Sequence, residues 1–393
     1  MSINSDTLNF SISEDEQSVL DLTREICVNE VIPQRAELDE HEIFPDKIFD
    51  KFREAGLFGA LFPGDYGGLG LGPFLTTLII EVISEYCLGV GTAFGATKLG
   101  ALPIEVGGTE EQKQKYIPAL ASGEKIAAFG LSEPGAGSDV PSMSTFAGKK
   151  RDKYVLNGTK QWISNAGVAD VYTIFAISDK AKGARGITCF IVEKDTPGLS
   201  FGALERKLGI RCSHTRQVIL EDVEVPEENV VGLKPNKGFV HAVQTLMASR
   251  PFIATMATGL ATGAYKEAVK YAREREQFGK KIINFQALNH MLAQMLVKIE
   301  GAKLLAYRAA KYAIHRHPET AKTSAIAKYY ASEIAMQVAT DAVQVHGGYG
   351  FTKDYPVEKM FRDAKILTIY EGTSQIQLNE IGSYVIRDAA SMK

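Results

Sequence analysis

Cysteine is scarce in this chain, and none of its four cysteines forms a CxxC pair. A zinc site or a disulfide framework is therefore not expected, and this usage fits a reducing cytoplasm. The seven histidines include no HExxH motif, and no apolar run is long enough to span a bilayer. The first residues lack a basic stretch followed by an apolar core, so we expect no secretory signal. A net charge of -3 argues against a general nucleic-acid partner.

The pattern along the 393 residues changes twice, which predicts three domains rather than one core. Residues 1–125 have helical periodicity, and Thr109 followed by acidic residues is typical of a capped helix start. Residues 126–238 favour β-structure. Residues 239–393 are helical again, with breaks near Lys280 and Pro318 that indicate an antiparallel bundle.

The middle segment contains several short β-candidates separated by glycine and proline. We expect a hairpin whose tight turn is Asn157-Gly158, between strands Tyr154–Leu156 and Thr159–Ile163. Further strands are predicted at Val171–Ile177, Ile187–Glu193 and Val218–Val225. Short antiparallel strands at this spacing favour a small barrel or sandwich. The fold class is thus α+β, with helical, β and helical domains in that order.

Glu371 lies in the run Ile369-Tyr370-Glu371-Gly372-Thr373-Ser374-Gln375 near the C-terminus. A carboxylate flanked by apolar residues can have a raised pKa and act as a proton base. The following glycine lets a ligand approach the backbone, and the hydroxyls and amide offer hydrogen bonds. Taken alone, a solvated glutamate at a helix end explains the run equally well.

Four other segments carry polar or aromatic groups in glycine-rich or helix-end settings. Residues 129–139 form a serine- and glycine-rich turn that can bind phosphate or serve as a surface loop. Trp162, the one tryptophan, precedes Ser164, a pairing that suits a planar heterocycle but also an ordinary core. Residues 273–280 form a charged helix end, and residues 344–351 a glycine-rich break between helices.

Together these segments resemble the acyl-CoA dehydrogenase family over almost the whole chain. The matching text, in order, is GLSEPGAGSD, QWISNAG, REQFGK, QVHGGYGF and RDAKILTIYEGTSQIQ. The resemblance implies an N-terminal helical domain, a middle β-barrel, a C-terminal four-helix bundle and FAD as cofactor. A neighbouring subunit contributes to each flavin site in the family, which implies at least a dimer, and similar proteins are commonly homotetramers built as dimers of dimers.

The resemblance assigns residues to the flavin by position. Phe129, Leu131, Ser132 and Ser138 are expected along the flavin and its phosphates, Trp162 over the ring, and Ser164 near N5. Towards the pyrophosphate and adenosine it implies Arg275, Gln277, Phe278 and Gln286. Gln344 and Gly348 are expected to reach the neighbouring subunit's flavin, whereas Thr373 and Gln375 contact their own.

The implied reaction is α,β-dehydrogenation of an acyl-CoA thioester. Glu371 would remove the α-proton while the β-hydride passes to flavin N5, and an electron-transferring flavoprotein would accept the electrons. On the substrate side the resemblance implies Ser138, Arg250, Gly91, Gly95 and Gly372. A glutaryl-CoA-type decarboxylating dehydrogenase and an acyl-CoA oxidase remain alternatives on the same fold.

The acyl group is less predictable from the sequence. Gly91 and Gly95 lie where medium-chain members carry bulkier residues, which suggests room for a branched, alicyclic or medium-chain group. Close helix packing explains the same two glycines equally well. Glutaryl-CoA dehydrogenases carry an arginine near the Val90 position, and here no cation lies nearer than Lys98, so a dicarboxyl substrate is disfavoured.

Overall fold

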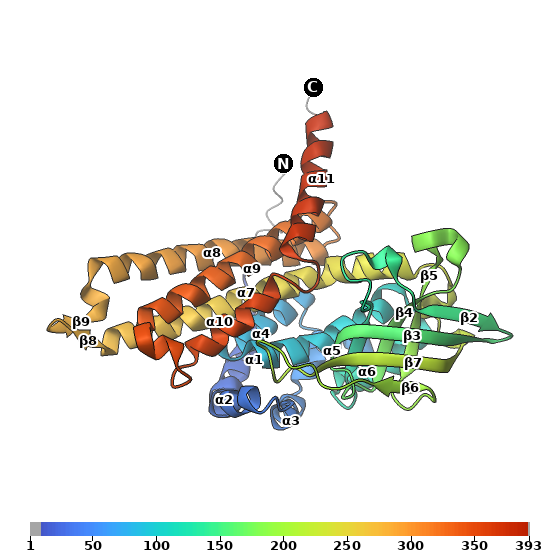
Figure 1. Cartoon of the computed structure of the whole chain (residues 1–393), viewed down its shortest axis with the longest axis horizontal. Coiled ribbons are helices and arrows are strands. Elements are labelled where there is room, and N and C mark those ends of the chain that lie inside the picture. The colour runs from blue at the N-terminus through green and yellow to red at the C-terminus, as the bar shows by residue number, and fades with distance from the viewer. Residues whose placement is uncertain (1–8, 392–393) are drawn as a thin grey trace.

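The computed structural model describes residues 9–391, and the chain runs from a helical region through a sheet into a long helical bundle (Figure 1). The N-terminal region begins at a capping box, in which Ser13 Oγ accepts from Glu16 N and the Glu16 carboxylate accepts from Ser13 N. Its helices are α1 (Glu14–Ile26), the π-helical η2 (Cys27–Val31), α2 (Ile32–Glu40), α3 (Asp46–Glu54), α4 (Pro73–Tyr86), α5 (Leu88–Gly107) and α6 (Glu110–Ala121). Thr109 caps α6, as its sequence predicts.

The middle region is a curled sheet of seven strands within the described residues. The strands are β1 (Ala127–Gly130), β2 (Phe146–Lys150), β3 (Lys153–Ser164), β4 (Val171–Ile177), β5 (Ile187–Glu193), β6 (Leu199–Phe201) and β7 (Thr215–Pro226). β4 and β5 have the predicted bounds, and β7 contains the third predicted strand. Most pairs are antiparallel, as expected, but β1 and β2 each pair with β4 in parallel, which the expectation of antiparallel strands did not include.

The predicted hairpin at Asn157-Gly158 is also wrong, because both residues lie inside the continuous strand β3. The register against β7 shifts between Leu156 and Gly158, so this dipeptide forms a bulge rather than a turn. Asn157 instead bonds Asp222 across the pair, accepting from its backbone N at 2.9 Å. The real hairpin joins β2 to β3, where Lys150 pairs with Lys153 around a tight turn.

The C-terminal region is built on three long helices and α10. Its elements are α7 (Gly238–Glu274), β8 (Glu276–Gln277), β9 (Lys280–Lys281), α8 (Gln286–Ile314), α9 (Thr320–His346), α10 (Val357–Leu367) and α11 (Ser374–Ser391). The predicted breaks near Lys280 and Pro318 are confirmed. α7 packs against α4 and α5 as well as against α8 and α9, and this joins the two helical regions in one hydrophobic core.

The long axis of the molecule separates two ends (Figure 1). The small β8–β9 hairpin lies at one end of the bundle, the curled sheet lies at the other, and α11 projects from the side. No helix within residues 9–391 is long and apolar enough to cross a membrane. The turn that carries Glu371 connects α10 to α11, and both helices lie between these two ends (Figure 1).

Candidate active site

The Glu371 turn has a strained backbone that neighbouring helices hold in place. Glu371 has φ 52° and Gly372 has φ 91°, both in the left-handed region that a non-glycine residue rarely adopts. From α9, Lys328 Nζ donates to Gly372 O at 2.7 Å. From α11, Gln377 Nε2 donates to Glu371 O at 3.1 Å and to Gly372 O at 3.2 Å. Both carbonyls of the turn are therefore fixed by buried side chains.

The Glu371 carboxyl group is half-buried, and its pKa is raised to about 7. Burial is the main cause, because loss of solvent disfavours the charged form. A hydrogen bond from Ser249 Oγ and the positive charges of Lys328 and Arg250 act in the opposite direction. A carboxylate with a pKa near neutrality is suited to accept a proton at neutral pH.

Trp162 is presented to solvent by an irregularity in β3. The register between β3 and β7 shifts between Lys160 and Ile163, and Trp162 has φ 62°. Bulges of this kind re-aim a side chain next to a functional site, and here the indole is 62% exposed. An exposed aromatic face on a rigid strand is available to cover a flat ligand, so the core alternative for this tryptophan is excluded.

Two hydrogen bonds connect the Trp162 segment to other predicted site segments. Gln161 N donates to Ser132 O at 2.9 Å, which joins the serine-glycine loop to β3. Asn165 is buried, and its backbone has φ 63°. Its side-chain Nδ2 donates to Ala93 O at 2.9 Å. Asn165 thereby attaches this segment to α5, the helix that contains Gly91 and Gly95.

The buried ion pair between Glu133 and Lys160 anchors the serine-glycine loop to β3. Glu133 accepts from Lys160 Nζ at 2.7 Å, from Ser144 N at 2.6 Å and from Thr145 N at 3.0 Å. Beyond Glu133 the loop is open, because the space beside Gly135 and Gly137 is free and Ser138 is exposed. Phe129 and Leu131 lie nearer the core, and Ser132 is partly exposed. The loop is thus anchored at its start and accessible at its tip.

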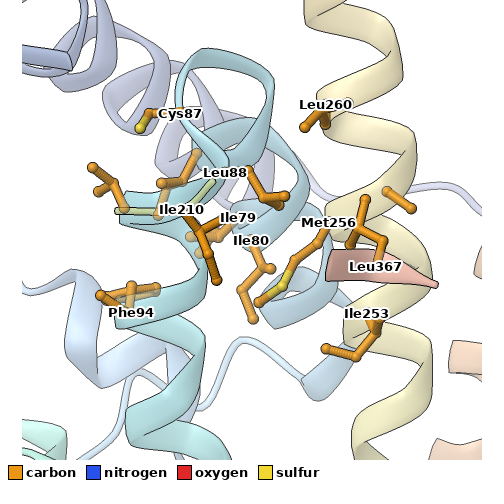
Figure 2. Packing of buried hydrophobic residues seen from close by; sticks show 14 of the residues in the cluster. Ile79, Ile80, Cys87, Leu88, Phe94, Ile210, Ile253, Met256, Leu260 and Leu367 are labelled. Atoms are coloured by element: carbon orange, nitrogen blue, oxygen red, sulfur yellow. The ribbon is translucent and has the colours of Figure 1, made fainter. Parts of the chain in front are cut away.

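The two glycines of α5 do not leave a cavity. A Cβ on Gly91 would lie 2.3 Å from Ser84 Oγ, and a Cβ on Gly95 would lie 2.5 Å from Met256 Cε. Figure 2 shows Met256, from α7, pointing towards Ile80 of α4. The expectation of extra acyl room at these positions is therefore wrong, and the alternative of close helix packing holds.

Met256 connects this packing to the candidate base. The Tyr370 hydroxyl donates to Met256 Sδ at 3.6 Å, and Tyr370 directly precedes Glu371.

Lys98 is occupied elsewhere, because its ammonium pairs with Glu105 at 2.6 Å and lies 4.9 Å from the centroid of the Phe62 ring. It does not offer a free cation for a second carboxylate on a substrate.

Arg250 is buried and already paired. Its Nη1 donates to Glu380 Oε2 on α11 at 2.6 Å, while its Nε has no hydrogen-bond partner in the described part of the chain. Thr373 Oγ1 accepts from Ile376 N at 3.2 Å and so caps α11, and Gln375 is exposed. Both residues lie in the turn region of Glu371.

A second group of predicted residues gathers at the opposite end of the molecule. A cavity of about 500 Å³ near the β8–β9 hairpin is lined by Arg275, Gln277 and Gly348, together with the stacked rings of Tyr271 and His346. Phe278 is 93% exposed, with φ 51°. The other two predicted residues of this group, Gln286 and Gln344, are exposed as well.

One chain does not bring this cavity to Trp162, because the hairpin and the sheet lie at opposite ends of the long axis (Figure 1). The predicted cofactor residues therefore form two half-sites. Each half-site fits part of a dinucleotide-sized cofactor: Trp162 and the open glycine loop suit a flat ring and its phosphates, and the cavity with Arg275 suits an anionic, aromatic portion.

Sequence reasoning missed Lys328, Ser249, Gln377 and Asn165. None of them belongs to a local motif that points to the site, and each reaches it through contacts between distant segments. No signal in the sequence marked Lys328 or Ser249, because each lies among other polar residues of its helix.

Three family models cover most of the chain. The acyl-CoA dehydrogenase N-terminal domain matches residues 13–124, the middle domain matches 128–223, and the C-terminal domain matches 236–386. A short-chain-specific acyl-CoA dehydrogenase of Clostridium acetobutylicum is 47% identical over 97% of this chain and 100% of its own length. A caffeyl-CoA reductase–Etf complex subunit of Acetobacterium woodii is 42% identical over 95% of this chain and 99% of its own.

The solved structures agree. Butyryl-CoA dehydrogenase from Megasphaera elsdenii superposes with a TM-score of 0.93 at 40% identity, covering 96% of this chain and 100% of that one. The fold is therefore shared over nearly the full length of both chains. This chain belongs to the acyl-CoA dehydrogenase family, enzymes that use FAD to dehydrogenate acyl-CoA thioesters.

Proposed function

We propose that Glu371 is the base that removes the α-proton of a short-chain acyl-CoA in this enzyme. The observation that carries this assignment is a half-buried carboxyl group with a pKa near 7 on a turn fixed by Lys328 and Gln377. Bound FAD supplies the acceptor for the β-hydride. The Glu371 backbone N–H is available to donate to the thioester carbonyl, which would spread the negative charge that develops on it.

The pH dependence follows from the direction of the Glu371 pKa shift. The base must be ionised to accept a proton, so the rate constant for flavin reduction should rise with pH through about 7 and level off above it. Below the pKa we expect about a tenfold loss for each pH unit. Anaerobic stopped-flow flavin bleaching across this range measures the effect, and a rate independent of pH through 7 would contradict the assignment.

The acyl group is proposed to be short. Relatives of this length are named as short-chain specific, and Met256 fills the space beside Gly95 where a longer chain could otherwise extend. The same packing fills the two glycine positions that suggested room for a medium-chain, branched or alicyclic group. Bleaching with a panel of acyl-CoAs from butyryl to octanoyl, with glutaryl-CoA included, tests the proposal. Faster bleaching by octanoyl-CoA than by butyryl-CoA would overturn it.

Replacing Met256 by alanine should lengthen the accepted chain. A methylene is worth roughly tenfold or more in kcat/KM in an apolar pocket, so the hexanoyl-to-butyryl ratio should rise by at least about tenfold. Met295→Ala is the matched control. Met295 is buried in α8, so its replacement by alanine removes a similar apolar volume from the core. An unchanged ratio in Met256→Ala would show that Met256 does not limit the chain.

The partners and assembly are proposed on separate observations. An electron-transferring flavoprotein is the proposed acceptor, since a relative is named as part of an Etf complex. The two half-sites support an assembly of at least two chains, because a second chain is needed to bring Arg275 and Gly348 to a flavin at Trp162, and a homotetramer built from two such dimers is the proposed assembly. The four free, buried cysteines support a cytoplasmic location. Peroxide production during turnover would favour an oxidase instead.

A further inference from the structure

Lys328 is a buried lysine without the ion pair that usually accompanies one. Its side chain is 0% exposed, and within residues 9–391 it forms no ion pair with a carboxylate. The three other buried lysines of the described residues differ, since Lys98 pairs with Glu105, Lys160 with Glu133 and Lys359 with Asp363. Burying a charge without a partner is costly.

The single hydrogen bond of the Lys328 ammonium goes to Gly372 O, in the turn that carries Glu371. Three charged groups act on the Lys328 ammonium. Glu371 and Glu333 favour the ammonium, and Arg250 disfavours it. Glu333 is itself engaged, because Ser374 Oγ donates to its carboxylate at 2.6 Å. Among these charges, Glu371 has the largest effect on the pKa of Lys328, and it raises that pKa.

We propose that Lys328 is a positioning residue for proton abstraction: it holds the Glu371–Gly372 turn from α9 and supplies a fixed positive charge that favours ionised Glu371. The proposal rests on Glu371 being the base. Two separate consequences follow. The hydrogen bond keeps the turn in the left-handed conformation that aims the carboxylate, and the charge offsets part of the desolvation that disfavours its ionised form.

Lys328 and Glu371 each shift the pKa of the other in the direction that favours the charged form. Burial lowers the pKa of Lys328 to about 8, and the negative charge of Glu371 partly restores it. Burial raises the pKa of Glu371 to about 7, and Lys328 acts against that rise. Removing the cation should therefore raise the pKa of Glu371 further, and a neutral Glu371 would be the dominant form at pH 7.

The test compares Lys328→Met, Lys328→Gln and the control Lys298→Met in the FAD-loaded enzyme. Lys298 lies on α8 and pairs with Asp341, away from the Glu371 turn. The first readout is the titration of the Glu371 carboxyl group without substrate, by infrared difference spectroscopy against Glu371→Gln. The second is the pH profile of flavin bleaching by butyryl-CoA.

We expect Lys328→Met to raise the pKa of Glu371 by about one unit and to slow bleaching at pH 7 at least tenfold, with partial recovery at higher pH. Lys328→Gln keeps a neutral donor, so it should show the same titration shift with a smaller loss of maximal rate. Lys298→Met should change neither. If the methionine variant fails to fold or bind FAD, the glutamine variant decides.

An unshifted Glu371 titration in the decisive variant would overturn the proposal, and so would an equal loss of rate at every pH. Failure of the underlying function is distinguishable. If Glu371→Gln bleached as fast as wild type, the base assignment would fall, while the infrared titration would still report whether Lys328 acts on that carboxyl group.

Discussion

Glu371→Gln should reduce the rate of flavin bleaching by butyryl-CoA by roughly a thousandfold to ten-thousandfold, the upper range for loss of a general base. Glutamine has nearly the shape of glutamate and can still accept from Ser249, so the turn and the FAD site should remain intact. The purified variant should therefore be yellow and should still bind acyl-CoA. Anaerobic stopped-flow absorbance measures the rate, and flavin content measures the integrity of the site.

Glu333→Gln is the matched control for that loss. Glu333 is another carboxylate near the same turn, bonded by Ser374, and it is assigned no role in proton transfer. Its replacement should leave the bleaching rate within a few-fold of wild type. Rapid bleaching by Glu371→Gln, or an equal loss in Glu333→Gln, would remove Glu371 from its role.

The second large effect is on stability. Lys160→Met leaves Glu133 buried without its counter-charge, and breaking such a pair costs about 3–5 kcal/mol. Because Glu133 also accepts from Ser144 N and Thr145 N, the serine-glycine loop should loosen at the same time. We expect a lower thermal unfolding temperature and weaker FAD retention, both measurable on the purified protein.

A double variant separates charge from packing. Glu133→Gln combined with Lys160→Met removes the unpaired charge and keeps an acceptor oxygen for one of the two loop amides, which the carboxylate binds through separate oxygens. The double variant should recover much of the lost stability. If it were no more stable than Lys160→Met alone, the loss would come from packing around Lys160, and the ion pair would not be the cause.

The fold was predictable where local patterns are strong. β4 and β5 have their predicted bounds because continuous apolar runs between turn residues define them. Asn157-Gly158 failed for a physical reason: a dipeptide that favours a tight turn also fits a bulge, and the partner strand β7 decides between them. Pairing with a distant strand is not encoded in the dipeptide itself.

The site shows the same division. Glu371, Trp162 and Arg275 belong to distinctive local runs, and these identified the family. Lys328 and Ser249 reach the Glu371 turn only after α7 and α9 pack together, so no local run points to them. Gly91 and Gly95 misled in a related way, because a missing side chain in the sequence does not show whether Ser84 or Met256 fills the space.

The central claim, that Glu371 removes the α-proton, is tested most directly by hydrogen exchange. Butyryl-CoA would be incubated anaerobically in deuterium oxide with wild-type enzyme and with Glu371→Gln, and deuterium at the α-carbon would be followed by mass spectrometry. The account predicts that wild type incorporates deuterium and that the variant incorporates none on the same timescale. Equal incorporation by the two proteins would contradict it.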